Sequence, residues 1–149
     1  MISVMRLAQG TALWQELICY AQSCSWEAGK HLAHIMRDNQ FRDWESVFAA
    51  LDGGSIAGFC TLLNTDFYPE NRYSPWISTI FVGEEYRGRR ISRRMIEAAI
   101  EYARSQGFAR VYIPSDITGL YEKYGFEKID ELKNYAGDVD GIFARDIIE

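Results

Sequence analysis

Residues 76–107 constrain the fold of this chain more than any other stretch. The segment WISTIFV (76–82) is rich in β-branched and aromatic residues and is apolar on both faces, which predicts a strand in the interior of a sheet. A short turn follows, and from Ile91 apolar residues recur at helical spacing as far as Gln106. Gly107 is suited to end this helix because glycine adopts the left-handed backbone of a C-cap.

The turn between this strand and this helix carries a concentration of positive charge. The chain has a formal net charge of −5, yet residues 87–94 contain no acid and five arginines, namely Arg87, Arg89, Arg90, Arg93 and Arg94. A helix N-terminus presents unpaired N–H groups and the positive end of the helix dipole, and Gly88 permits close approach of a ligand. These features predict a binding site for a polyanion. The alternative is that the arginines are solvated and pair with nearby acids, namely Glu84, Glu85, Glu97 and Glu101.

Length and composition favour one ordinary globular domain over residues 1–149, with 48% hydrophobic and 25% charged residues. A pI near 5.1 argues against a general nucleic-acid binder. The N-terminal residues lack the pattern of a signal peptide, and no apolar run is long enough to span a bilayer. Three cysteines without a C-x-x-C pair predict reduced, buried thiols in a cytoplasmic protein. The pI and the lack of a long apolar run make neither a nucleic acid nor a membrane an expected partner.

No metal site is predicted. His31 and His34 are three residues apart on an expected helix, but no third ligand of the right kind lies near them in the sequence. We therefore expect both side chains at the surface.

The remaining patterns predict a mixed α/β chain with a central sheet. Ser25 is a candidate N-cap for the second helix, and Asp52-Gly53-Gly54 is a candidate hairpin turn. The expected strands cover residues 2–7, 44–51, 55–63, 109–113, 126–133 and 141–148, and the expected helices cover residues 12–21, 26–38 and 116–124.

The stretch from Asn64 to Pro75 is a long polar and aromatic loop, a candidate for substrate contact. Asp66 and Trp76 could bind a cationic amine by charge and by an aromatic face. Asp66, Glu70 and Glu45 are also open alternatives for a general base, each competing with a plain surface role.

Two motifs give the chain a resemblance to the Gcn5-related N-acetyltransferase (GNAT) family. The stretch VGEEYRGRRISRRMIEAAIEYARSQGF resembles the acyl-CoA-binding motif of the family, with Val82, Arg87, Gly88 and Ile91 at matching positions. The stretch GLYEKYGFEKI (119–129) resembles the family's second, C-terminal motif. The resemblance implies the GNAT fold, of class α/β (α+β), with a mixed, mostly antiparallel sheet flanked by helices.

The sequence departs from the family pattern at three places. Arg90 stands where a glycine is usual, and Ser92 stands where glycine or alanine is usual. An arginine at this position can still donate its backbone N–H to a ligand if the backbone is helical and the side chain points outward. The asparagine that often precedes the second motif is absent, with Ser115, Asp116 and Thr118 in its neighbourhood.

The resemblance also implies a set of site residues. Tyr121 corresponds to the tyrosine that protonates the leaving thiolate, and a backbone N–H from residues 80–82 would polarise the thioester oxygen. The residues implied to bind acetyl-CoA are Ile80, Phe81, Val82, Arg87, Gly88, Arg89, Arg90, Ile91 and Ser92.

The function expected from this resemblance is transfer of an acetyl group from acetyl-CoA to a primary amine of a small molecule or a peptide. The alternative is a non-catalytic acyl-CoA-binding regulatory module. An enzyme that acetylates tRNA is disfavoured because the chain lacks further basic surface. Family members are often dimers, so a homodimer is one expectation.

Overall fold

The computed structural model describes residues 1–148 and confirms the expected sheet. Within these residues, seven strands are hydrogen-bonded in the order β1-β2-β3-β4-β5-β7-β6, so β4 is the central strand, as its apolar faces predict. The sheet is mostly antiparallel, and β4 pairs with β5 in parallel, which confirms the predicted fold class. The strands are β1 (Ile2–Arg6), β2 (Ser46–Asp52), β3 (Ser55–Leu63), β4 (Trp76–Val82), β5 (Arg110–Ser115), β6 (Glu127–Lys133) and β7 (Val139–Asp146).

Three α-helices and two short 3₁₀ helices complete the described chain. These elements are α1 (Ala12–Ser23), α2 (Glu27–Arg37), η1 (Glu84–Tyr86), α3 (Ile91–Ser105) and η2 (Tyr121–Tyr124). None of the helices in residues 1–148 has the length and apolarity that crossing a membrane requires.

The described residues group into two compact units. The first consists of residues 1–61 and 79–98, and the second of residues 62–78 and 99–148. Both β4 and α3 run through the two units. The single domain over 1–149 stays a prediction.

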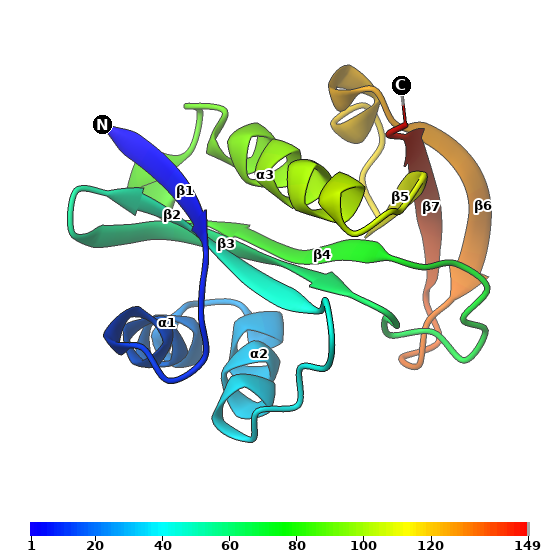
Figure 1. Ribbon diagram of the computed structural model, residues 1–149. Helices are drawn as coiled ribbons and strands as arrows, with labels where there is room; N and C mark the ends of the chain where they lie inside the picture. The colour runs from blue at the N-terminus through cyan, green and yellow to red at the C-terminus, as the bar shows by residue number, and fades with distance from the viewer. Residues whose placement is uncertain (149) are drawn as a thin grey trace. The chain divides into compact units, whose positions relative to one another are not determined.

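In the first unit, α1 and α2 lie side by side next to the strands β1–β3 (Figure 1). Thr11 caps α1, because its Oγ1 accepts a hydrogen bond from the backbone N–H of Trp14. The Trp14 indole is 2% exposed and donates to the carbonyl of Met36, which ties the two helices together. Burial of Leu17, Leu32 and their neighbours follows from the apolar face of each helix.

The β3 and β4 strands approach each other unusually closely at Gly58. A Cβ atom placed on Gly58 would lie 2.4 Å from the carbonyl oxygen of Phe81 and 3.3 Å from the Cα of Val82. Just beyond β4, the N–H of Gly83 donates to the carbonyl of Ala57 at 2.8 Å. Only glycine therefore allows the end of β4 to lie where it does.

In the second unit, aromatic residues form the core beside the β6–β7 hairpin. Trp76 is fully buried and stacks on Tyr68 at 5.6 Å, and Leu132 and Ile142 complete the cluster. The β5 strand pairs over its whole length with residues 141–146 of β7, from Arg110 opposite Asp146 to Ser115 opposite Gly141. In β6 the register shifts between Lys128 and Asp130, as in a β-bulge.

Four sequence predictions need correction. The second helix has Trp26, not Ser25, as its N-cap, and Trp26 makes no side-chain cap bond, since its indole has no acceptor atom; its ring stacks on Phe81. Residues 44 and 45 lie outside β2. The expected helix over 116–124 is only the four-residue η2, which Gly125 ends with φ of 88°. Cys19 is exposed rather than buried, because it lies on the outer face of α1.

The close approach at Gly58 leads to a prediction about stability. Gly58→Ala should lower the free energy of unfolding by about 1–3 kcal/mol, because the added methyl group forces the backbone of Phe81 to move. Gly54→Ala is the control, since no atom lies within 4 Å of its Cβ position. Urea denaturation of both variants measures the difference, and equal stabilities would show that β4 can shift at no cost.

Candidate functional site

The arginine turn, residues 87–90, connects η1 to α3 through an unusual backbone. Gly88 has φ of 83° and Arg90 has φ of 59°, so two of its four residues lie in the left-handed region. The carbonyl of Arg90 accepts the hydrogen bond from the N–H of Arg94, the first bond of α3. The N–H groups in the first turn of α3 therefore lack partners within the helix itself, as at any helix start. The region around the Gly88 Cβ position is open space.

Two arginines of the turn contact neighbouring residues of the first unit, to which the turn itself belongs. The Nε of Arg87 donates to the carbonyl of Val82 at 3.1 Å, and its guanidinium lies 5.9 Å from the ring centre of Phe81. The guanidinium of Arg89 lies 5.5 Å from the ring centre of Tyr86, whose hydroxyl donates to Asp52 at 3.1 Å. These contacts fix the base of the turn and leave its charge at the surface.

Within residues 1–148, Arg87, Arg89, Arg90 and Arg94 form no ion pair with a carboxylate. The expected alternative, in which the cluster is neutralised by nearby glutamates, therefore does not describe these four side chains. Glu101 pairs with Arg104 instead. Like charges packed in one turn without internal counter-ions favour an external anion.

An open hollow of about 370 Å³ lies along the end of β4 next to the arginine turn. Its lining residues come from β4, from the turn and from the start of α2, and they are Ser25, Trp26, Ile80, Phe81, Val82 and Arg87. Four of these six residues, Ile80, Phe81, Val82 and Arg87, belong to the set expected from sequence to bind acetyl-CoA.

Stacked aromatic rings form the wall of this hollow. Trp26 stacks on Phe81 at 6.1 Å with 14° between the ring planes, and Phe81 stacks on Phe59 at 5.3 Å. Tyr20 meets both phenylalanines edge to face. Burial raises the pKa of the Tyr20 phenol, and the charge of Glu85 adds to this effect. The aromatic rings of the lining, Trp26 and Phe81, are therefore backed by further rings, and Arg87 is the one cation among the lining residues.

Sequence reasoning missed Ser25 and Trp26 as site residues. Trp26 is 37% exposed although it is a large apolar side chain at a helix start. A tryptophan in the break between two amphipathic helices was the available signal, but its partner Phe81 lies 55 residues further along the chain. Only the folded structure joins them.

Tyr121 lies in the second unit, at the start of η2. Its side chain is 9% exposed and contacts the rings of Tyr124, Phe126 and Phe143 at centroid distances of 6.1 to 6.4 Å. The loop before it is held by a hydrogen bond from the Gly119 N–H to Glu122. Ser115, near the absent asparagine, caps the local turn by accepting from the Ile117 N–H at 3.0 Å. The catalytic role of Tyr121 stays a prediction.

The predicted amine-binding residues Asp66 and Trp76 have mainly structural contacts. Asp66 is half-buried, and its Oδ1 accepts from the N–H of Phe67 at 2.6 Å. Trp76 is fully buried, with rings of Tyr68, Tyr73 and Tyr112 around it. The indole ring of Trp76 therefore packs against these core tyrosines, and its binding of an amine stays a prediction.

Metal binding finds no support in the described residues. No group of three or more His, Cys, Asp or Glu side chains in residues 1–148 is arranged to hold a metal ion. His31 and His34 are both exposed, and His34 lies 3.4 Å from Asp38. Cys60 is buried, which raises the pKa of its thiol to about 12 and leaves it unreactive.

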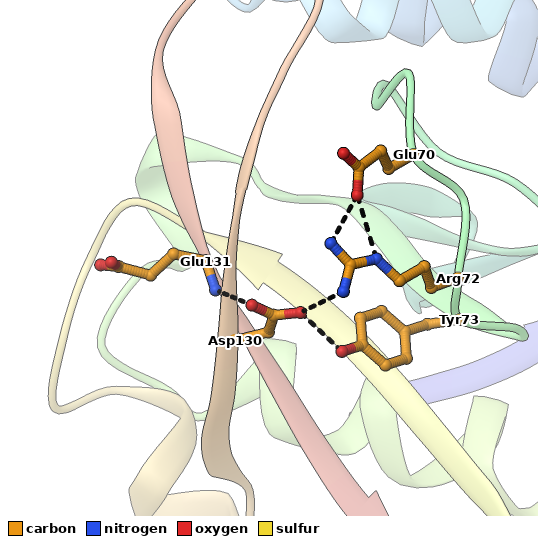
Figure 2. A network of polar contacts seen from close by, with 5 residues as sticks. All are labelled: Glu70, Arg72, Tyr73, Asp130 and Glu131. Atoms are coloured by element: carbon orange, nitrogen blue, oxygen red, sulfur yellow. Dashed lines mark hydrogen bonds and ion pairs between the residues drawn. The ribbon is translucent and has the colours of Figure 1, made fainter.

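A network of polar contacts ties the long loop before β4 to β6 (Figure 2). Tyr73 donates from its hydroxyl to Asp130 at 2.6 Å, and Arg72 lies 3.8 Å from the same carboxylate. Arg72 also donates to Glu70, and the N–H of Glu131 donates to Asp130 at 2.7 Å. Asp130 follows the register shift in β6, which accounts for its orientation toward the loop.

A second tyrosine of this loop makes an equivalent bond. The hydroxyl of Tyr68 donates to Asp140 of β7 at 2.8 Å, and Asn134 donates to the same carboxylate. Burial raises the pKa of the Tyr68 phenol, and its bond to Asp140 strengthens this effect. The loop predicted for substrate contact is therefore an ordered segment fastened to the β6–β7 hairpin.

A comparison with known protein families gives a match over most of this chain. The sequence model of the acetyltransferase (GNAT) family matches residues 11–126, which include the arginine turn and η2. No curated protein matches the sequence of this chain.

Solved structures share the fold at low sequence identity. An aminoglycoside 6′-N-acetyltransferase in complex with coenzyme A has a TM-score of 0.76 at 15% identity, with 99% of this chain and 98% of that chain covered. The aminoglycoside 6′-N-acetyltransferase from Enterococcus faecium has a TM-score of 0.74 at 15% identity, with the same coverage. An acetyl-CoA-bound acetyltransferase from Elizabethkingia anophelis has a TM-score of 0.66 at 18% identity, with 97% of each chain covered.

The network around Asp130 predicts a pH dependence of stability. The hydrogen bond from Tyr73 lowers the pKa of Asp130, as do the Glu131 N–H and the charge of Arg72. A lowered folded-state pKa contributes stability above the unfolded-state pKa, and this contribution is lost as the pH falls through the folded-state pKa. Asp130→Asn should therefore lower the melting temperature at neutral pH, and the difference from wild type should shrink toward about pH 2.

Thermal melts of wild type and Asp130→Asn across this pH range measure the effect. Asp138→Asn, on the exposed turn between β6 and β7, is the control with the same change of charge. A difference that persists unchanged in acid would mean that the ionised form of Asp130 is not what stabilises the loop.

Proposed function

The chain belongs to the GNAT family of acetyltransferases, and we propose that it transfers an acetyl group from acetyl-CoA to a primary amine of a small molecule or a peptide. The observation that carries this proposal is the arginine turn, with two left-handed residues and uncompensated cations at the start of α3. A pyrophosphate group suits this arrangement, because it can accept several backbone N–H bonds and pair with guanidinium groups at once.

The residues present fit acetyl-CoA. The space over Gly88 admits a ligand directly against the backbone, and the hollow continues from Arg87 along Ile80–Val82. We propose that the turn (Arg87, Gly88, Arg89, Arg90, Ile91 and Ser92) holds the phosphates and that Ile80, Phe81 and Val82 hold the chain that carries the acyl group. The solved relatives with coenzyme A or acetyl-CoA bound support this assignment.

Acetyl-CoA, when bound, supplies an acetyl group activated as a thioester. A backbone N–H from Ile80–Val82 would donate to the acyl oxygen and stabilise the negative charge that develops there. As the C–N bond forms and the C–S bond breaks, the attacking amine would lose one proton to water and the hydroxyl of Tyr121 would give its proton to the departing sulfur, after which Tyr121 would regain a proton from water. Holding both reactants in place supplies most of the acceleration in such a reaction.

For the acceptor, the hollow itself offers a candidate contact. Trp26 presents part of its ring, and the lining of the hollow contains no acid. We propose that Trp26 packs against the carbon skeleton of the acceptor amine. Aminoglycosides, the substrates named for two of the solved relatives, are one class of acceptor to test.

A second candidate function is a non-catalytic acyl-CoA-binding module. The observation that favours it is the burial of Tyr121 among three aromatic rings, which suits a purely structural role. The two candidates differ in one measurable respect, since only the enzyme releases coenzyme A when an amine is added.

The first test measures cofactor binding and turnover together. Acetyl-CoA at about 100 times its Kd should raise the melting temperature by roughly 5–10 °C. A panel of amines, including aminoglycosides, polyamines and peptides with a free N-terminus, should then reveal acceptors through release of free thiol. No thermal shift at millimolar acetyl-CoA would reject the proposal, whereas a shift without thiol release from any amine would favour the binding module.

The second test concerns Tyr121. Tyr121→Phe keeps the buried ring but removes the hydroxyl, so turnover should fall by about a hundredfold while the Kd for acetyl-CoA changes less than about twofold. Tyr124→Phe is the control, because Tyr124 lies in the same 3₁₀ helix. Turnover that is equal in Tyr121→Phe and wild type would remove Tyr121 from the chemistry.

A further inference from the structure

The hollow along the end of β4 has a lining that is mainly apolar. The lining consists of four apolar side chains, one hydroxyl and one guanidinium, which belong to Ser25, Trp26, Ile80, Phe81, Val82 and Arg87. None of these six residues is an acid. The lining therefore favours an acceptor whose body is apolar over one that is polar throughout.

The last residues of β4 are only half-buried, although β4 is the central strand of the sheet. Residues 76–78 are buried, whereas residues 79–82 are partly open to solvent. Apolar side chains of a central strand are normally covered, and apolar surface that stays open marks a binding site. Under the proposed function the acyl arm of acetyl-CoA covers Ile80, Phe81 and Val82, which leaves Trp26 for the acceptor.

Trp26 offers the acceptor a flat ring that is held at a fixed angle. It stacks on Phe81 with 14° between the ring planes, and Phe81 stacks on Phe59 with 22°, so the three rings are nearly parallel. Within residues 1–148, Trp26 makes no other ring contact, and it is still 37% exposed. An ordered ring with this much free surface suits stacking against an aromatic ring of a ligand.

Charge at the hollow disfavours an acceptor with several positive charges. Arg87 lines the hollow, and no carboxylate of the lining balances it. Of the acids nearby in sequence, Glu27 is paired with Lys30 at 3.2 Å, and Glu85 is exposed and lies outside the lining. A polyamine or an aminoglycoside would bring several ammonium groups to this surface and would find no ion pair there to offset their lost hydration.

We infer that the acceptor is an arylalkylamine, in which a short alkyl chain joins one primary amine to a flat aromatic ring that stacks on Trp26. This inference rests on the proposed function and narrows its acceptor. The transfer itself is unchanged: the amine nitrogen forms the C–N bond, the C–S bond breaks, and coenzyme A leaves as the thiol. A hollow of about 370 Å³ lies near the lower end of the range for small-molecule sites, roughly 300–1,000 Å³, which suits a small ring system.

Two matched amines test the role of the aromatic ring in wild type. 2-Phenylethylamine and 2-cyclohexylethylamine share a carbon skeleton and a charge, and only the first has a flat aromatic ring. The kcat/KM from thiol release should be about two- to tenfold higher for 2-phenylethylamine, which is the effect of one aromatic pair beyond the area that it buries. Spermidine and kanamycin should be poorer acceptors than either amine, because both carry several ammonium groups.

Variants of Trp26 test where the ring binds. Trp26→Leu keeps an apolar side chain and should remove the preference for 2-phenylethylamine, whereas Trp26→Phe should retain most of it. Calorimetric titration of 2-phenylethylamine in the presence of coenzyme A measures binding without turnover, and its Kd should rise about two- to tenfold in Trp26→Leu. The Kd for acetyl-CoA should change less than about twofold in both variants, and thermal melts show that each variant is folded.

Met5→Ala is the control for loss of exposed apolar surface. Met5 is 46% exposed on β1 of the same unit and does not line the hollow. Its replacement should leave both the preference for 2-phenylethylamine and the Kd of this amine as in wild type.

Three results would overturn the inference. These are equal kcat/KM values for the two matched amines in wild type, a preference that persists in Trp26→Leu, and faster turnover of spermidine or kanamycin than of 2-phenylethylamine. Each of them leaves acetyl transfer to an amine in place. A wild-type chain that does not bind acetyl-CoA, or that releases no thiol with any amine, would instead reject the proposed enzyme and this inference with it.

Discussion

The close approach of β3 and β4 at Gly58 is the constraint on which the candidate site depends. With no side chain at this position, the carbonyl oxygen of Phe81 comes within a distance that no Cβ atom would allow, and the Cα of Val82 lies at a tight contact distance. The Gly83 N–H then bonds to Ala57, and Val82 accepts a hydrogen bond from Arg87. Contacts at the end of β4 thus set the position from which the arginine turn starts.

The same strand supports both parts of the site in the first unit. Phe81 contacts Phe59, Trp26 and Arg87, so one side chain joins the sheet, the start of α2 and the arginine turn. Arg87 is oriented by a carbonyl and by an aromatic face, and no carboxylate neutralises it within residues 1–148. A guanidinium held in this way keeps its charge for a ligand while losing little conformational freedom on binding.

The second unit orders its long loop by a different means. Two tyrosines of the loop donate to carboxylates of the β6–β7 hairpin, Tyr68 to Asp140 and Tyr73 to Asp130. Each tyrosine ring also packs against Trp76, so the loop is fastened by apolar and polar contacts together. A twelve-residue connection between β3 and β4 thereby becomes a defined surface rather than a flexible link.

Local sequence determined the elements and the family of this protein. The apolar faces of 76–82 predicted the central strand, Gly53 and Gly54 the hairpin turn, and the arginine turn with the motif around Tyr121 the relation to acetyltransferases. These signals are local, because turn residues, helix periodicity and short motifs act within a few positions of the chain. The 3₁₀ form of η2 and the start of α2 at Glu27 were missed because packing at the ends of helices outweighs propensity.

Tertiary structure alone decided which distant residues meet. Trp26 joined the site by stacking on Phe81, and Trp76 became a core residue because three tyrosines surround it. The departure at Arg90 was visible in the sequence, but its left-handed backbone and the absence of an ion partner within residues 1–148 were not. Contacts between residues far apart in the chain depend on how the strands and helices pack, and a single sequence does not encode that packing in any local pattern.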